Sequence, residues 1–430
     1  MNKERIILYF DRAIMVFLCL VVFCLPFSKA GIESFLWPAI FLWILKRVFG
    51  YKVGSFLNLP KTDLNKALGI FVAAIFLSVV FSANIGLSLR GFFGKELKFL
   101  AIYFMLVEVV TTRKRLKSVL IVFVASAVLI TADAAVQYFY GVDFIRGFEW
   151  ARSRASFSTS NGFAAWLIVV IPLFLGFLAL GKGLSKKLKF LLSILVILLL
   201  ICLLATYARG GWFGFIIGIL FMFFYIFKNL KLKTKLLLLF FSVGLLAAFL
   251  ILPHSLKSKI TAIGKLNFRS YVTINERIKS FIKIEEGGSN LVRLRLWSEA
   301  LRITKDFPMV GCGLNTYSIV ARGYKSFEQG GIYPHNSYFQ MLAETGLLGL
   351  FAFLFVLYSF FRMGLRYLNQ KKDYLALGFL SGILAFLAHA FFDTHFYSLQ
   401  LVVLFWFMLG LTVAIIKLGS GAASVQYDKK

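Results

Sequence analysis

Residues 190–227 read FLLSILVILLLICLLATYARGGWFGFIIGILFMFFYIF, and Arg209 is the one charged side chain in this stretch. A helix rises about 1.5 Å per residue, so about 20 apolar residues are needed to cross the ~30 Å hydrocarbon layer of a membrane. The two parts, 190–206 and 212–227, approach this length, and the turn between them is too short for a real loop. The stretch therefore predicts two membrane-crossing helices with Arg209 at the turn.

The same pattern extends along the whole chain of 430 residues, of which 60% are hydrophobic and 16% charged. A mean hydropathy of +0.83 excludes an ordinary soluble enzyme, because a surface in water needs more polar side chains. We predict an all-α polytopic membrane protein with about 12 transmembrane helices in a single integral-membrane domain. This domain covers residues 1–430, and no small-residue cleavage site follows the first run, which we interpret as a retained helix. The predicted spans are 13–27, 32–45, 67–85, 91–110, 119–140, 162–180, 190–206, 212–227, 236–252, 337–361, 374–392 and 396–416.

Cations outnumber acids, with 48 Lys and Arg against 19 Asp and Glu and a net charge of +29. In a soluble protein this excess would indicate a nucleic-acid partner. If the N-terminus is inside and the chain alternates sides, 27 of these cations fall in inside segments and eight in short outside connections. This bias follows the positive-inside rule. It predicts cytoplasmic N- and C-termini, contacts with membrane lipids and no nucleic-acid partner.

The other 13 cations lie in one long outside segment, residues 253–334, together with six acids. We predict that this segment is a loop subdomain with amphipathic helices, one of them near 268–282. In a second helix, Leu294, Trp297 and Leu301 share one face, which suits packing over the membrane helices or contact with the membrane surface.

Several common cofactor motifs are missing from the sequence. It carries no CxxC pair, no His/Cys cluster with metal spacing, no nucleotide-binding glycine loop and no DxD pair. We therefore expect no metal and no other cofactor. The four cysteines provide no disulfide framework, since three of them lie inside apolar runs.

Polar residues at the outer ends of the helices are the candidates for a site, and all four histidines fall on that side. His335 stands in the sequence Pro334-His335-Asn336-Ser337 at the start of the run 337–361. Asn336 or Ser337 can cap this helix, and the free backbone N–H groups there disfavour imidazolium. His335 is then a neutral proton acceptor near pH 7, or it is a simple cap residue.

Two arginines are candidates for holding an anion. Arg209 precedes Gly210 and Gly211, which let backbone N–H groups approach a phosphate at the start of a helix. The alternative is a single arginine that extends to lipid phosphates. Arg293 lies one turn before Trp297 in the outside segment, and we expect it to point into a cavity beneath its helix.

These residues form a pattern that resembles the O-antigen ligase and polymerase superfamily. His335-Asn336, nine residues, Gly346, two residues and Gly349 reproduce the form H-[NSQ]-x9-G-x-x-[GTY]. Further similar stretches are RLRLW at 293–297, PMVGCG at 308–313, AETGLLG at 343–349, TYARG at 206–210, and RASF at 154–157 followed by Asn161. The single large loop between the ninth and tenth runs is more similar to the ligase branch than to the polymerase branch.

The resemblance implies a GT-C-like membrane glycosyltransferase of lipopolysaccharide biosynthesis. Its site would lie at the periplasmic face of a bacterial inner membrane. There a glycan would move from a polyprenyl (undecaprenyl) diphosphate carrier to a hydroxyl of the lipid A core oligosaccharide, without a metal or a nucleotide.

The resemblance also implies roles for single residues. Arg209 and Arg293 would hold the diphosphate, because a guanidinium pairs bidentately with phosphate. His335 would act on the acceptor hydroxyl. Asp393, at the last outer turn, would orient a cation or His335, or serve as a structural cap. The expected substrate-binding residues are Asn336, Gly210, Arg154, Asn161 and Asp393.

Three alternatives stay open. Two belong to the same superfamily: a polysaccharide polymerase that joins repeat units, and a protein O-oligosaccharyltransferase. The third is a secondary transporter, in which the acids Asp133 and Glu344 would line a pathway. Against transport, the sequence has no internal repeat and no long central inside loop between two halves.

Overall fold

The computed structural model describes residues 3–50, 59–149, 152–179, 184–228, 289–325 and 333–421. Within these residues every regular element is a helix, and the extended pairing is limited to one isolated bridge. The prediction of an all-α polytopic membrane protein is confirmed.

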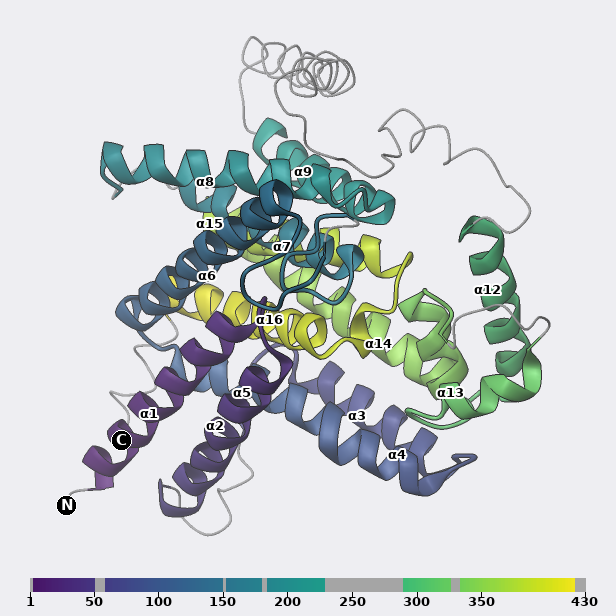
Figure 1. Cartoon of the computed structure of the whole chain (residues 1–430). Helices are drawn as coiled ribbons and strands as arrows, with labels where there is room; N and C mark the ends of the chain where they lie inside the picture. The colour runs from purple at the N-terminus through teal and green to yellow at the C-terminus, as the bar shows by residue number, and fades with distance from the viewer. Residues whose placement is uncertain are drawn as a thin grey trace, which may run out of the picture.

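The helices fall into two groups along the chain (Figure 1). The first group contains α1 (Lys3–Cys24), α2 (Lys29–Gly50), α3 (Asn65–Val80), α4 (Ile85–Gly91), the π-helical turn η1 (Phe92–Glu96), α5 (Leu97–Val109), α6 (Arg113–Tyr140), α7 (Ser160–Ala179), α8 (Lys186–Ala205) and α9 (Arg209–Lys228). The second group contains α12 (Ser289–Asp306), α13 (Tyr317–Val320), the 3-10 turn η2 (Ala321–Tyr324), α14 (Ser337–Gln370), α15 (Tyr374–Ala390), the 3-10 turn η3 (His395–Tyr397) and α16 (Leu399–Gly419).

Seven of the described helices are long and apolar enough to cross a membrane, namely α1 from Arg5, α6, α7, α8, α9, α14 and α16. The shorter apolar helices α3 and α15 cover two further predicted spans. The ninth predicted span, 236–252, lies outside the described residues, as does the predicted amphipathic stretch 268–282. The total of about 12 crossings and the loop boundaries 253–334 therefore stay predictions.

Glycines allow α15 to lie close to both α7 and α9. A Cβ on Gly378 of α15 would lie 2.5 Å from the carbonyl oxygen of Pro172 in α7. A Cβ on Gly214 of α9 would lie 2.5 Å from the carbonyl oxygen of Ala385 in α15. Small residues let helix backbones approach in this way, and van der Waals contact then holds the helices together in lipid. The outer ends of α7, α9 and α15 are thereby brought together.

Helix α14 is broken at Gly346, which has φ 65° and ψ −169°. Only glycine adopts this conformation without strain. The segment before α13 inserts into the break: Leu347 N donates to Pro308 O at 2.9 Å, and Gly313 N donates to Glu344 O at 3.0 Å. The backbone groups that the break frees are thus paired with the outside segment.

Helix α12 packs only partly with the predicted face. Leu296, Ala300 and Ile303 are buried against α14 and η2, whereas Leu294 and Leu301 are exposed. Of the predicted face, Trp297 alone packs on a membrane helix, against Phe339 of α14. Contact of these two leucines with a membrane surface stays a prediction.

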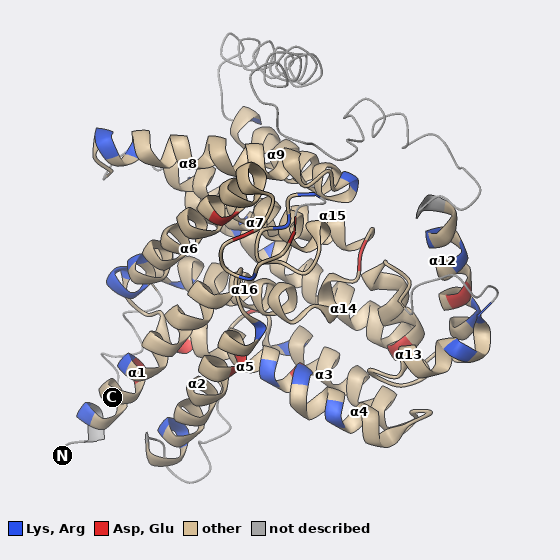
Figure 2. Cartoon of the chain, in the orientation of Figure 1, with Lys and Arg blue, Asp and Glu red and all other residues tan. Residues whose placement is uncertain are grey.

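Figure 2 shows basic residues at one end of α6 and of α8, and charged residues along the length of α12. The basic N-terminal ends of α6 and α8 lie on the same side of the molecule, and α12 lies on the opposite side (Figures 1 and 2). The placement of the basic ends of α6 and α8 opposite α12 agrees with the predicted alternation of the chain, and the choice of membrane side stays a prediction.

A buried ion-pair network links α1, α2 and α5. Lys46 Nζ lies 2.7 Å from Asp11 and 2.6 Å from Glu108.

Candidate active site

The start of α14 presents His335 in a conformation that most residues avoid. His335 has φ 47°, in the left-handed region. Asn336 is the N-cap, and its Oδ1 accepts hydrogen bonds from Tyr338 N at 2.9 Å and Phe339 N at 3.1 Å. The prediction that Asn336 caps this helix is confirmed. Non-glycine residues in the left-handed region are found preferentially at functional sites.

His335 pairs with Asp393, which lies between α15 and η3. Their Nδ1 and Oδ1 atoms are 3.1 Å apart. The other carboxylate oxygen of Asp393 accepts a hydrogen bond from Asn161 Nδ2 at 2.8 Å, and Ser337 Oγ donates to the Asp393 carbonyl at 2.8 Å. The imidazole is 44% exposed and the carboxylate 17%. Asp393 therefore ties the beginnings of α7 and α14 together and leaves one face of His335 open.

Asp393 is an anion in this setting. Burial alone would raise the pKa of its carboxyl group. The hydrogen bond from His335, the neighbouring His395 and the hydrogen bond from Asn161 outweigh burial, and the pKa lies well below its usual range. An ionised Asp393 can orient His335 and stabilise a proton on it, but it cannot donate a proton itself near neutral pH.

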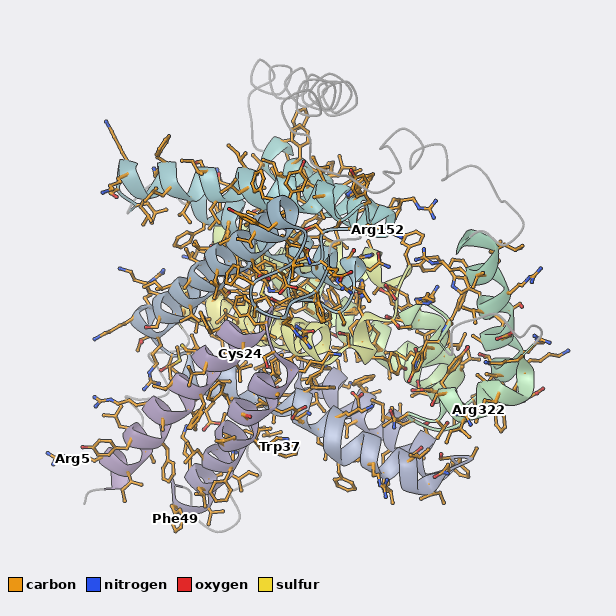
Figure 3. All side chains as sticks on the ribbon, in the orientation of Figure 1. Arg5, Cys24, Trp37, Phe49, Arg152 and Arg322 are labelled. Carbon is orange, nitrogen blue, oxygen red and sulfur yellow. The ribbon has the colours of Figure 1, made fainter. Side chains whose placement is uncertain are left out.

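Three arginines gather beside this pair. The charges of Arg293 and Arg152 act on the Arg209 guanidinium, and the charge of Asp393 acts on Arg293. Burial lowers the pKa of Arg293, and Asp393 offsets part of this effect. Arg152, which the sequence reasoning missed, lies on the loop before α7 (Figure 3). Three cations against one carboxylate make a local excess of positive charge that favours an anionic ligand.

Aromatic contacts fix Arg293 over the site. Trp297, one turn later in α12, has its ring centroid 5.5 Å from that of Phe339 and 5.4 Å from that of Phe391. Phe339 belongs to the first turn of α14, and Phe391 lies two residues before Asp393. The outside segment is therefore anchored to the same two elements that carry His335 and Asp393.

Residues 194–354 match the family model for O-antigen ligase. This match supports the O-antigen ligase superfamily over that part of the chain. The matched segment begins in α8 and ends within α14, so it contains Arg209, Arg293 and His335 but neither Asn161 nor Asp393. A search of the curated proteins found no match. The match and the apolar helices together indicate a membrane protein with glycosyltransferase-like activity of the ligase and polymerase type.

The superfamily pattern from His335 to Gly349 has a structural explanation at each fixed position. His335 and Asn336 start α14, and Gly346 breaks it. A Cβ on Gly349 would lie 2.1 Å from Thr345 Oγ1, a hydroxyl that donates to Met341 O at 2.7 Å. The glycines therefore shape the helix that presents His335.

Gly210 contacts the site through packing. A Cβ on Gly210 would lie 2.9 Å from His389 Cδ2 and 2.8 Å from Phe392 Cβ. The observed reason for a glycine is thus the close approach of α9 to α15, and the predicted approach of its N–H to an anion stays a prediction. His389 in turn packs against His395, with ring centroids 4.3 Å apart. Both histidines are buried, and both interact electrostatically with Asp393.

Arg154 occupies a different place from the other predicted site residues. Its guanidinium lies over the Phe148 ring, 4.4 Å from the centroid, and its backbone N–H donates to Gln137 Oε1 at 3.1 Å. Asn161, by contrast, contacts Asp393 as described above. The structure therefore joins Asn161 to the site, whereas Arg154 contacts α6 and the loop that follows it.

The two buried acids that a transporter would use have backbone partners. Asp133 accepts hydrogen bonds from Phe144 N at 3.0 Å and from Ser156 Oγ at 2.7 Å. Glu344 accepts from Asn315 N at 3.0 Å and Tyr397 OH at 3.0 Å. Both carboxylates thus hold loops in place, which is a sufficient reason for their burial.

Proposed function

We propose that this protein is a ligase-type glycosyltransferase that moves a glycan from a polyprenyl diphosphate to a hydroxyl of lipid A core oligosaccharide. The reaction takes place at the periplasmic face of the inner membrane. The 3.1 Å contact between His335 and Asp393 is the observation that carries the proposal, because it fits a histidine that accepts a proton.

The arginines act on the donor. Arg209 and Arg293 bind the diphosphate, and their charges stabilise the negative charge that grows as it leaves. Arg152 supplies a third positive charge, and this charge acts on the Arg209 guanidinium. In this proposal the arginines, and not a metal ion, carry this role.

His335 acts on the acceptor. With its Nδ1 proton donated to Asp393, the imidazole has Nε2 available to take the proton of the acceptor hydroxyl. The hydroxyl oxygen forms a bond to the anomeric carbon, and the bond from that carbon to the diphosphate oxygen breaks. The Asp393 carboxylate stabilises the imidazolium that results.

The nature of the acceptor separates the ligase from its alternatives. Purified protein is incubated with a polyprenyl-diphosphate glycan and, separately, with lipid A core, a second lipid-linked glycan or a protein acceptor. We expect a product whose mass equals lipid A core plus the glycan. Extension of the lipid-linked glycan would identify a polymerase, glycosylated protein a protein transferase, and the absence of every product would refute glycosyl transfer.

Substitutions connect this product to the site. We expect His335→Ala, Arg209→Ala and Arg293→Ala each to lower the rate by at least about 10²-fold. Arg322→Ala is the matched control, because Arg322 is exposed in η2 and lies apart from Arg152 (Figure 3). Parent rates in the three site variants would exclude this assignment of roles.

A further inference from the structure

A second site lies between the π-helical turn η1 and the break in α14. It is a cavity of about 350 Å³, within the lower part of the range for small-molecule sites. His335, Arg209 and Arg293 do not line it. Six charged side chains do, three cations and three carboxylates: Arg90, Lys95, Lys98, Glu33, Glu96 and Glu344.

The π-helical turn brings charged residues of one segment to the same cavity. In a regular helix, at about 100° per residue, Glu96 would point about 140° away from Gly91. The wider turn over Phe92–Glu96 changes this phase, so that Gly91, Lys95 and Glu96 all line the cavity. Gly91 also permits a close approach, since a Cβ there would lie 2.8 Å from Asn315 Cβ.

Most of the cavity wall is held rigid by its own contacts. Lys98 Nζ lies 2.6 Å from Glu33 Oε1, and Lys95 Nζ donates to Asn315 Oδ1 at 2.6 Å. Glu344 accepts the hydrogen bonds from Asn315 and Tyr397 given above. Arg90 and Glu96, in contrast, have no hydrogen-bond partner among the described residues, so a donor and an acceptor are left for a ligand.

The polar side chains of the wall restrict what can bind. A phosphate would lie beside the carboxyl groups of Glu96 and Glu344, and Lys98 is already paired with Glu33. An acyl chain would have to displace water from these polar groups without replacing their hydrogen bonds. A neutral ligand rich in hydroxyl groups avoids both problems, because each hydroxyl can donate to a carboxylate and accept from a cation.

We propose that this cavity binds a neutral sugar residue of the acceptor oligosaccharide. The aromatic side chains of Phe99, Phe396 and Tyr397 also line it and offer apolar faces to the ring of a sugar. This assignment rests on the proposed function, because that function supplies the glycan acceptor.

The position of the cavity favours the acceptor over the donor. Helices α9 and α4 lie on opposite sides of α14 (Figure 1). Arg209, at the start of α9, is one of the two proposed diphosphate ligands, whereas the cavity lies beside α4. Segment 393–397 joins the two sites, since Asp393 contacts His335 and Tyr397 contacts Glu344.

The spacing of the two sites suits an oligosaccharide. From Ser337, where α14 begins beside His335, to Glu344 the helix rises about 10 Å. This is longer than a single sugar ring. The cavity therefore holds a sugar further along the acceptor chain and helps to position the reacting hydroxyl at His335.

Binding to a protein that cannot react tests this site directly. The probe is dephosphorylated core oligosaccharide released from lipid A, titrated calorimetrically into full-length His335→Ala protein. We expect Glu96→Gln in this background to weaken binding at least about tenfold, because a charge-assisted hydrogen bond is lost. Arg90→Gln, at an exposed position, is a second variant with the same expected direction. Asp63→Asn, an exposed acid outside the cavity, is the matched control.

The outcomes separate this inference from the proposed function. No binding by the His335→Ala protein, or unchanged affinity in Glu96→Gln and Arg90→Gln, overturns the cavity assignment. Inorganic pyrophosphate binding that is lost in Arg90→Gln would also overturn it, because it would show an anion site. Oligosaccharide binding through Glu96 without any transfer product from the parent protein refutes the proposed function and leaves the sugar site standing. Transfer with an unchanged acceptor KM in Glu96→Gln refutes the sugar site and leaves the proposed function standing.

Discussion

Asp393 is the residue on which the geometry of His335 depends. It contacts a side chain from α7, one from before α14 and a hydroxyl from the first turn of α14. The sequence alone left two readings for it, an orienting carboxylate or a structural cap. The 3.1 Å contact with His335 Nδ1 favours the first reading.

Replacing this carboxylate with an amide tests the orienting role. We expect Asp393→Asn to lower kcat by about 10²-fold with little change in donor KM, because the imidazolium formed during transfer loses its stabilising charge. Since the pKa of Asp393 lies well below its usual range, the carboxylate is ionised across the assay range of about pH 5 to 8. The loss in kcat should therefore extend across this whole pH range.

Asp306→Asn provides the control for this measurement. Asp306 is an exposed acid at the end of α12 whose carboxylate accepts a hydrogen bond from Tyr324. Rates are measured against pH for both variants and the parent. An Asp393→Asn enzyme with the parent's kcat across this pH range would exclude the orienting role.

At the scale of elements, the break in α14 decides how the outside segment attaches to the membrane helices. Two helical halves meet at Gly346, and the segment around Pro308 to Gly313 fills the gap with backbone hydrogen bonds. The same break positions Glu344, which lines the cavity. One glycine therefore influences both sites.

Gly346→Ala should destabilise the protein. A Cβ at this position would lie 2.3 Å from the Met309 backbone carbon, and φ 65° with ψ −169° is strained for any other residue. We expect a loss of about 3 kcal/mol in the free energy of unfolding. The melting temperature of the purified protein in detergent reports this loss.

Gly323→Ala is the comparison, because a Cβ on Gly323 would meet nothing within 4 Å. It should melt like the parent. Equal melting temperatures for both variants would mean that the backbone at Gly346 can relax, and that the break does not depend on glycine.

At the scale of the whole molecule, the distribution of cations predicts how the protein sits in the membrane. The inside group includes the exposed Lys187 at the start of α8, and the outside segment includes the exposed Arg322 of η2. The proposed function requires the outside segment, with Arg322, to face the periplasm.

Cysteine labelling checks this orientation. With a membrane-impermeant maleimide, we expect Arg322→Cys to react in intact spheroplasts and Lys187→Cys to react only after the membrane is disrupted. The natural cysteines are buried or half-buried, and the parent protein gives the background. The opposite pattern would invert the topology and would be incompatible with a periplasmic site.

The sequence by itself determined the helical membrane class, most of the span positions and the cap of α14. Each of these depends on a continuous segment: the length of an apolar run, or an Asn placed before a helix start. It also indicated His335, Arg209 and Arg293 through their places at helix ends and through a resemblance. The identification of Arg293 depended on that resemblance, since many cations share its segment.

Tertiary structure decided which of these helix ends meet. His335 and Asp393 are 58 positions apart, and Arg152 is still further from Arg293, so no local spacing could pair them. The packing face of α12, the partners of Asp133 and the cavity beside η1 also depend on contacts between distant segments. Glycines bring α7, α9 and α15 together, but a glycine in a sequence does not reveal which backbone will approach it. The chain therefore encodes its helices locally, and its candidate site exists only once they pack.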